Sequence, residues 1–205
     1  AGDKIMSTAL LLLAQAAPGL IVQPAAPAHL DAVAALCVDS FVRLPFPTTI
    51  SRPQAVNRWK DQLAARLRQP TLQLLVATDD DGSLIGCAEI GMLPPPPLNA
   101  RVSTPQSARP AVQDVPYIAN VAVIPTARRQ GVGRKLVEAA EELSQTWGHT
   151  SVFIKVERSN IAARRLYDQL GYAIVFLRQL PPRWTSAPET QLFLRKSLVD
   201  HADGT

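Results

Sequence analysis

Residues 117–172 read YIANVAVIPTARRQGVGRKLVEAAEELSQTWGHTSVFIKVERSNIAARRLYDQLGY, and this stretch decides the fold. Its pattern predicts a strand, a basic glycine loop, a helix, a second strand and a second helix. Gly131 and Gly133 lie where the first helix begins, and three arginines surround them: Arg128, Arg129 and Arg134. Unpaired N–H groups and the positive end of the peptide dipoles meet at such a helix start, and glycine lets a ligand approach the backbone. The stretch therefore predicts a phosphate-binding site.

The motifs within this stretch narrow the kind of phosphate ligand. The loop has neither the Walker pattern G-x-x-x-x-G-K-[ST] nor the dinucleotide pattern G-x-G-x-x-G. It reads R-x-x-G-x-G from Arg128 to Gly133, and N-x-x-A-x-x-L-Y-x-x-x-G-Y follows from Asn160 to Tyr172. The two motifs, in this order and with one helix and one strand between them, resemble the signature of the GNAT superfamily of acyl-CoA N-acyltransferases. The resemblance is close over residues 117–172 and looser over the rest.

The resemblance implies an α/β fold with a mixed, mostly antiparallel central sheet of about six or seven strands flanked by four helices. A splayed parallel strand pair in that sheet would form the acetyl-CoA cleft. The composition, 205 residues with 47% hydrophobic and 19% charged, fits one well-cored domain, which we assign to residues 20–198. Residue patterns predict strands at 20–23, 72–77, 84–92, 117–125, 151–158, 172–178 and 191–196, and helices at 28–42, 51–69, 132–147 and 160–171.

Three segments lie outside this regular pattern. Residues 1–19 form an apolar extension with the run ALLLLA, which is too short to span a bilayer but could be the core of a targeting peptide. We expect a short apolar helix there, packed on the domain or on a partner such as a larger complex or a membrane surface. A proline-rich insertion at about 93–115 is a substrate lid, a docking arm or a segment without function, and 199–205 is a frayed tail.

Composition and spacing argue against a metal site and against nucleic-acid binding. The DDDG segment at 79–82 has no spaced partner carboxylate, so a solvated hairpin turn is the preferred interpretation. Cys37 and Cys87 belong to no metal-spaced cluster, and buried free thiols are favoured over a disulfide. The net charge of +4 and the pI near 9.4 suit an anionic ligand but are too mild to indicate nucleic acid.

The resemblance also implies which residues bind acetyl-CoA, the expected co-substrate. In this family the strand before the loop pairs its backbone with the pantetheine amides, and the loop amides hold the pyrophosphate. Asn160, which caps the last helix, contacts the pantetheine, and the Tyr167 hydroxyl points at the sulfur. The implied cofactor-binding set is Val121, Ala122, Val123, Arg129, Gln130, Gly131, Val132, Gly133, Arg134, Asn160 and Tyr167.

Two residues are the catalytic candidates, Tyr167 as the acid and Glu89 as the base. A thiolate leaving group needs a proton donor, and the phenol of Tyr167 on an inner helix face can supply one, although an ordinary core tyrosine is the alternative. Glu89 lies inside the apolar segment IGCAEIGM, where a carboxylate at the substrate amine competes with an outward-facing carboxylate on an alternating strand.

The expected base shows one departure from the family pattern. Some GNATs that acetylate protein N-termini carry a glutamate five residues before the helix-capping asparagine, and here that position is Lys155. A lysine cannot replace a carboxylate base unless its pKa is strongly lowered. Glu89 is therefore the first candidate, Glu157 the second and Tyr117 the third, and a water chain could carry the proton.

The expected function is an N-acetyltransferase that moves acetyl from acetyl-CoA to a primary amine. The closest likeness is to plastid-type GNATs of plants and algae, which acetylate protein N-termini and lysines, so a chloroplast stromal protein is expected. The alternatives are a bacterial cytoplasmic acetyltransferase of small amines, or a weakly active GNAT subunit of a larger assembly. Because the arginines cluster at a helix start and do not alternate with aromatics along a face, a nucleic-acid module is disfavoured.

Overall fold

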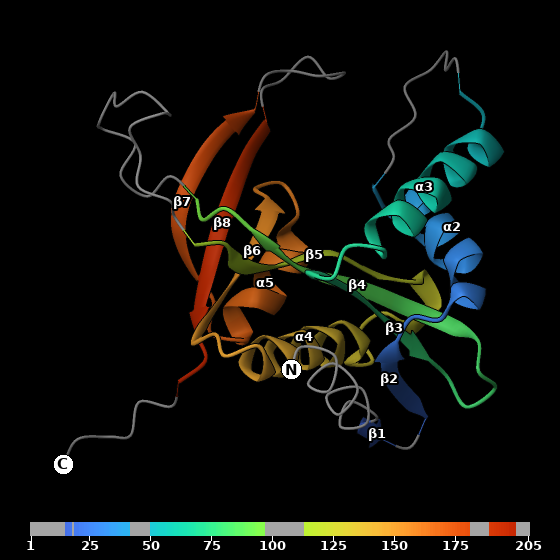
Figure 1. Ribbon diagram of the computed structural model, residues 1–205, viewed down its shortest axis with the longest axis horizontal. Coiled ribbons are helices and arrows are strands. Elements are labelled where there is room, and N and C mark those ends of the chain that lie inside the picture. Colours follow the sequence, from blue (N-terminus) through green and yellow to red (C-terminus); the bar gives the residue numbers. More distant parts are fainter. Residues whose placement is uncertain (1–14, 18, 42–49, 97–112, 181–188, 200–205) are drawn as a thin grey trace.

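An eight-stranded sheet forms the centre of the protein (Figure 1). The computed structural model describes residues 15–17, 19–41, 50–96, 113–180 and 189–199. The strands follow the order β1-β2-β3-β4-β5-β6-β8-β7, and only the β5–β6 pair is parallel. Their bounds are β1 (Gln15–Ala17), β2 (Leu20–Pro24), β3 (Leu72–Thr78), β4 (Leu84–Leu93), β5 (Val115–Val123), β6 (Ser151–Glu157), β7 (Ala173–Leu180) and β8 (Glu189–Ser197).

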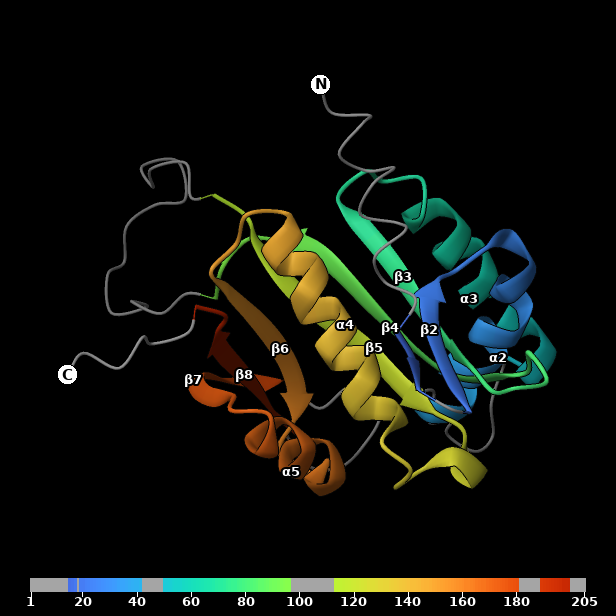
Figure 2. The same ribbon diagram turned by 90° about the horizontal axis from the view of Figure 1, so that it is seen from below.

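The four α-helices of the described ranges cover the two faces of this sheet (Figures 1 and 2). Helices α2 (Leu30–Phe41) and α3 (Arg52–Arg66) lie on one face, and α4 (Val132–Thr146) and α5 (Ile161–Gln169) lie on the other. Local signals in the sequence set where two of them begin. Ser51 and Gln54 form a capping box at the start of α3, and the Asn160 side chain accepts the Ala163 N–H at the start of α5.

Two apolar clusters hold these layers together. The larger lies between the sheet and α4–α5, and its buried members include Leu75, Ile90, Ile118, Leu136, Ile154 and Tyr167. The second joins β3 and β4 to α2–α3 through Val33, Cys37, Leu63, Leu74, Cys87 and Ala122. Because both faces of β3 and β4 are covered, the central residues of these two strands are buried on both sides instead of alternating between core and solvent.

The structure confirms the predicted fold class, including the parallel pair and the four helices. The sheet has one strand more than the upper expectation, because residues 15–17 pair with β2 as an edge strand. Residues 15–17 of the apolar extension are thus a strand, and the short helix expected in this extension falls on residues 1–14, which lie outside the described residues, as does most of the proline-rich segment. No helix in the described ranges is both long and apolar enough to cross a membrane.

Two smaller predictions, the free thiols and the hairpin turn, are confirmed within the described residues. Cys37 and Cys87 are buried free thiols, with their Sγ atoms 3.9 Å apart. The residues at 79–82 form a turn in which Asp79 Oδ1 accepts the Ser83 N–H at 2.8 Å, and the described residues contain no group that could hold a metal. Glu141 of α4 is buried and accepts a hydrogen bond from Lys196 Nζ at 2.6 Å.

Gly86 of β4 allows α4 to approach the sheet, and this contact yields a stability prediction. A Cβ at Gly86 would lie 3.0 Å from both the Ala122 carbonyl oxygen and Leu136 Cδ1. We expect Gly86→Ala to lower the free energy of unfolding by about 1–3 kcal/mol, because overpacking forces neighbours out of place. Urea unfolding measures this. Gly91→Ala is the control, since its Cβ would meet nothing nearer than 3.4 Å, and equal stability of the two variants would contradict the prediction.

Candidate active site

The parallel strands β5 and β6 form a fork. Their register joins Tyr117 to Phe153 and Ile118 to Ile154, and no further pairing joins them along the described strands. The outer edge of β6 pairs with β8 along its whole length, and β5 pairs with β4 on its other side. Beyond Ile118 and Ile154, the facing edges of β5 and β6, which we call the two arms of the fork, carry backbone N–H and C=O groups that do not pair with each other. An extended ligand that carries amides can lie in this gap and pair with them.

A bulge at Asn120 opens the fork. Cys87 pairs with Ala122 and Glu89 with Ala119, so two residues of β5 stand opposite one residue of β4. Asn120 takes a left-handed conformation with φ of 50°, which asparagine tolerates better than most side chains. The side-chain amide of Asn120 donates to Glu89 Oε1 at 2.8 Å, and this bond holds the bulge.

The bulge also changes which side chains face which helices. Tyr117 lies in a cluster with Phe153 and Phe193, while Val121 and Val123 pack against the core cluster that contains Tyr167. Without the extra residue, the period of two would place Tyr117, Val121 and Val123 on the same face. Side chains therefore alternate between the two faces from Asn120 to Val123, with Val121 and Val123 on one face and Ala122 on the other, and the bulge reverses this pattern relative to Tyr117.

Glu89 is the most buried carboxyl group near the fork, with 1% of its surface exposed. Its Oε2 lies 2.5 Å from Nη2 of Arg66, which stands in the last turn of α3. Burial raises the pKa of Glu89, although the Arg66 charge and the Asn120 hydrogen bond oppose the rise. The alternative of an outward-facing, solvated carboxylate is excluded, and Arg66 and Asn120 are partners that the sequence did not indicate.

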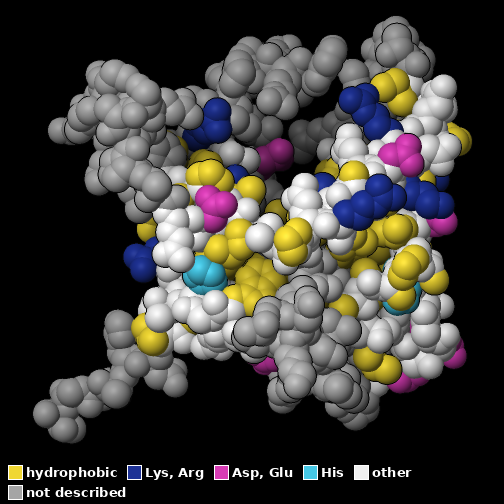
Figure 3. All heavy atoms as spheres, in the orientation of Figure 1, with side chains coloured by type: hydrophobic (Ala, Val, Ile, Leu, Met, Phe, Trp, Pro, Cys, Tyr) yellow, Lys and Arg dark blue, Asp and Glu magenta, His cyan; other side chains and the backbone are white. Residues whose placement is uncertain are grey.

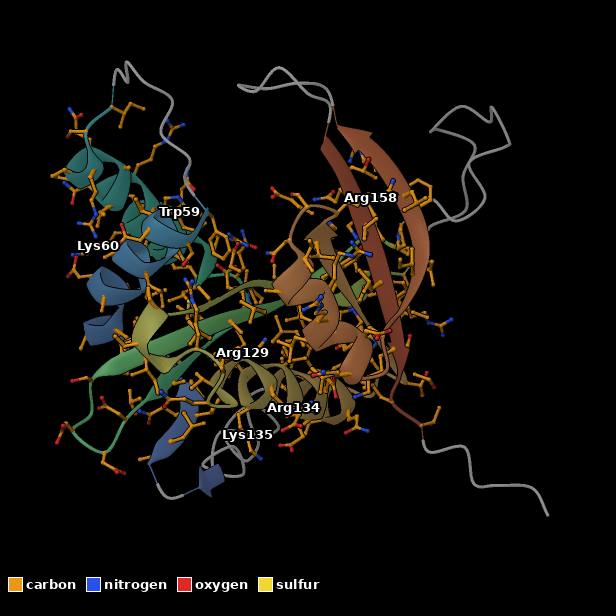
Figure 4. All side chains as sticks on the ribbon, turned by 180° about the vertical axis from the view of Figure 1, so that it is seen from behind. Trp59, Lys60, Arg129, Arg134, Lys135 and Arg158 are labelled. Atoms are coloured by element: carbon orange, nitrogen blue, oxygen red, sulfur yellow. The ribbon has the colours of Figure 1, made fainter. Side chains whose placement is uncertain are left out.

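The glycine loop forms a concave set of backbone amides at the start of α4. Arg129 and Gly131 have φ of 67° and 84°, and left-handed residues next to helical ones direct successive N–H groups to one point. A Cβ at Gly131 would meet no atom within 4 Å, so the space in front of the loop is open. Arg129, Arg134 and Lys135 lie at this end of α4 (Figure 4). Open amides and cations of this kind fit a diphosphate.

Helix α5 closes the other side of the fork. A Cβ at Gly133 would lie 3.3 Å from Leu166 Cδ2, so the glycine lets α5 approach the start of α4 closely. Asn160 accepts the Ala163 N–H at 3.1 Å, and Tyr167 is buried with its ring centroid 5.9 Å from that of Tyr172. Burial raises the pKa of Tyr167 to about 12, so its phenol stays protonated at neutral pH.

The predicted site residues meet at the fork from two faces of the sheet. The loop, Val121 and Val123 of β5, and α5 bring the implied cofactor-binding residues other than Ala122 and also Tyr167 to the α4–α5 side, whereas the Ala122 side chain faces α2–α3. Glu89 lies on the other side through its contact with Arg66. Tyr117 and Lys155 are also on that side, with Lys155 Nζ 4.4 Å from the Tyr117 ring centroid, and Glu157 lies exposed at the end of β6. An acid on one face could therefore protonate a leaving group while a base on the opposite face takes a proton from the attacking amine.

Comparisons with known proteins agree with this geometry. The sequence profile of the acetyltransferase (GNAT) family matches residues 38–172. The chain is 27% identical over 89 residues to GCN5-related N-acetyltransferase 4, chloroplastic, of Arabidopsis thaliana, covering 42% of this chain and 31% of the relative. It is 35% identical over 68 residues to the [ribosomal protein bS18]-alanine N-acetyltransferase of Salmonella typhimurium, covering 33% of this chain and 46% of that protein. The chain thus spans less than half the length of either relative.

Among solved structures, one similar fold is Arabidopsis thaliana NAA60 in complex with acetyl-CoA. The superposition has a TM-score of 0.64 and 15% sequence identity, and it covers 87% of this chain and 98% of the other. At 15% sequence identity, this similarity shows that the two proteins share a fold.

The buried carboxyl group of Glu89 gives a prediction for stability against pH. Its pKa is raised above 4.5 in the folded protein, so the folded state holds the proton more tightly than the unfolded state. The contribution of protonated Glu89 to the free energy of unfolding is therefore fully present below the ordinary pKa of the carboxyl group. It is lost as the pH rises through the raised pKa of the folded state. We expect the stability of Glu89→Gln relative to wild type to increase with pH across that window, measured by urea unfolding from pH 4 upward.

Asp81→Asn, in the exposed turn between β3 and β4, is the control for this series. Its stability relative to wild type should show no such rise with pH. A flat difference for Glu89→Gln over the same window would contradict the burial argument.

Proposed function

The chain belongs to the acetyltransferase (GNAT) family, and on this premise we propose that it transfers the acetyl group of acetyl-CoA to a primary amine by direct attack in a ternary complex. The observation that carries the proposal is the fork between β5 and β6, which ends at the amides and cations of the glycine loop. A long ligand with a diphosphate at one end and amides along its length suits that shape. No metal takes part in the proposed reaction.

Binding is assigned to three parts of the site. The amides of residues 129–134 and the nearby guanidinium groups hold the diphosphate. The backbone of Val121, Ala122 and Val123, on the open edge of β5, pairs with the pantetheine amides. Asn160, at the start of α5, completes the contacts on the other arm. This arrangement directs the thioester to the base of the fork, beside Ile118 and Ile154, where the strand pairing ends.

The proton balance assigns the two catalytic roles. The amine nitrogen forms a bond to the thioester carbonyl carbon, and the bond from that carbon to sulfur breaks. Tyr167 donates its phenolic proton to the departing sulfur, and a pKa of about 12 keeps that proton available at neutral pH. The second proton that the nitrogen loses as the amide forms returns to the Tyr167 phenolate. Glu89 accepts the proton of the arriving ammonium through a water chain, since its side chain is 2% exposed and cannot touch the amine directly. Burial raises its pKa and makes it a stronger base.

The proposed acceptor is a protein amine, either an N-terminal α-amine or a lysine ε-amine. Support comes from the names of the relatives, one of which acts on an alanine of a ribosomal protein. The plant relative is named chloroplastic, which favours the chloroplast stroma, whereas the Salmonella relative is compatible with a bacterial cytoplasm.

A titration and an acceptor panel test this proposal. We expect acetyl-CoA to bind at sub-millimolar concentration, and peptides with free N-termini or lysines to consume acetyl-CoA faster than polyamines or aminoglycosides. Thiol release measures turnover, and mass spectrometry locates the acetyl group. Absence of acetyl-CoA binding would remove the enzyme proposal. Turnover with small amines alone would remove the protein acceptor, and binding without any turnover would favour a weakly active subunit of a larger assembly.

Variants at Tyr167 and Glu89 test the catalytic roles. We expect Tyr167→Phe to lower kcat by about 100-fold or more, because a positioned acid contributes that much, while acetyl-CoA binding is retained. Glu89→Gln should lower kcat at neutral pH in the same way. Tyr172→Phe is the matched control, since it removes a neighbouring buried hydroxyl that the mechanism does not use. Wild-type kcat in Tyr167→Phe would exclude the phenol as the acid.

A further inference from the structure

The sheet face opposite Tyr167 carries aromatic rings that the proposed mechanism does not use. Tyr117, Phe153, Phe176 and Phe193 come from β5, β6, β7 and β8 and form one cluster. The ring centroids of Tyr117 and Phe153 are 5.3 Å apart, and those of Phe176 and Phe193 are 5.4 Å apart. The register explains the cluster, because Tyr117 pairs with Phe153 and Phe176 pairs with Phe193.

Three cations lie on or beside these rings. Lys155 Nζ is 4.4 Å from the Tyr117 ring centroid and 5.5 Å from that of Phe193, and Arg195 Cζ is 6.0 Å from the Phe153 centroid. Arg178, on β7, is close enough to Lys155 to lower the lysine pKa, a shift in which burial is the larger cause. The cross-strand pairs Phe153–Arg195 and Lys155–Phe193 thus alternate ring and charge between β6 and β8. We call Lys155, Arg178, Arg195 and the four rings the cationic–aromatic face.

The charges on this face are not neutralised within the described part of the chain. No ion pair there joins Lys155, Arg178 or Arg195 to a carboxylate. Two carboxylates also face this side from the described side chains of β4, β5 and β6. Glu89 is ion-paired with Arg66, and Glu157 lies at the far end of β6 and has a contact of its own. Among the described side chains, the face therefore carries more positive than negative charge.

Lys155 places this face at the point where the acceptor must arrive. It is the first residue of β6 beyond the last β5–β6 pair, and it projects to the side opposite Tyr167. An amine that approaches the fork from that side passes the Lys155 ammonium and the Tyr117 ring. Figure 3 shows a recess on this side of the molecule, with Lys and Arg side chains on both of its flanks.

We infer that the cationic–aromatic face is the acceptor subsite, and that it selects peptides whose amine is followed by acidic residues. A second positive charge on the acceptor would be repelled, whereas a carboxylate would be attracted and could bind the guanidinium groups in bidentate fashion. A nearby cation also favours the neutral form of the attacking amine. The face spans four strands, which is more than a single amino acid requires and suits an extended peptide. The inference rests on the proposed function.

The test compares matched peptides that differ only in charge. Three peptides share an N-terminal alanine and carry two aspartates, two serines or two lysines at the second and third positions. With the wild-type protein, kcat/KM should be at least about tenfold higher for the acidic peptide than for the basic one at low salt, and 0.5 M NaCl should reduce the ratio. Lys155→Met and Arg178→Gln should each lower the ratio.

Lys60→Met is the control, since it removes one positive charge on α3, where Lys60 pairs with Asp31 away from the fork (Figure 4). Its ratio should stay at the wild-type value. Equal rates for acidic and basic peptides, or ratios unchanged in both Lys155→Met and Arg178→Gln, would overturn the inference and leave the proposed function standing. Acetylation of diamines with no peptide acetylated would overturn the inference together with the protein acceptor.

Discussion

The site depends on one buried contact, in which the Glu89 carboxylate accepts the side-chain N–H of Asn120 and pairs with Arg66. A carboxylate with 1% exposure is costly unless it is paired, and the described structure supplies one partner from α3 and one from β5. The contact fixes Asn120 in a left-handed bulge, and the bulge separates β5 from β6. Residues from α3, β4 and β5, which are distant in the sequence, thus contact one another at the Glu89 carboxylate, and this contact keeps the fork open.

The bulge has a second consequence, because it decides what each face of the fork presents. Val121 and Val123 face the core around Tyr167, and Tyr117 faces Phe153 and Phe193. One face therefore offers a phenol and the open glycine loop, and the other offers rings with cations that pair with no carboxylate among the described residues. The two faces suit different ligands, an extended thioester on one and an approaching amine on the other. For the two ligands to meet at one point, β5 and β6 must stay paired up to Ile118 and Ile154 and separate beyond them.

Both ends of the site are cationic, but the backbone distinguishes them. At the start of α4 the left-handed Arg129 and Gly131 point amides at open space, which suits phosphate oxygens. On the face formed by β6, β7 and β8 the side chains project from the sheet while the amides lie in its plane, so the side chains are what a ligand on that face contacts. Lys155 illustrates the difference, because its ammonium rests on the Tyr117 ring without a carboxylate in the described part of the chain. Charge alone would not have separated these roles.

The sequence by itself determined the features whose partners lie within a few residues. The glycine loop, the Ser51 capping box and the Asn160 cap are each made within one turn of helix, so their residue spacing is enough to predict them. The parallel strand pair was expected from the motifs that carry the family resemblance. Only the tertiary structure decided the Asn120 bulge, the Arg66–Glu89 pair and the rings around Lys155. These depend on cross-strand register and on how a distant helix end meets a strand, and a one-residue change of register would turn every side chain to the opposite face.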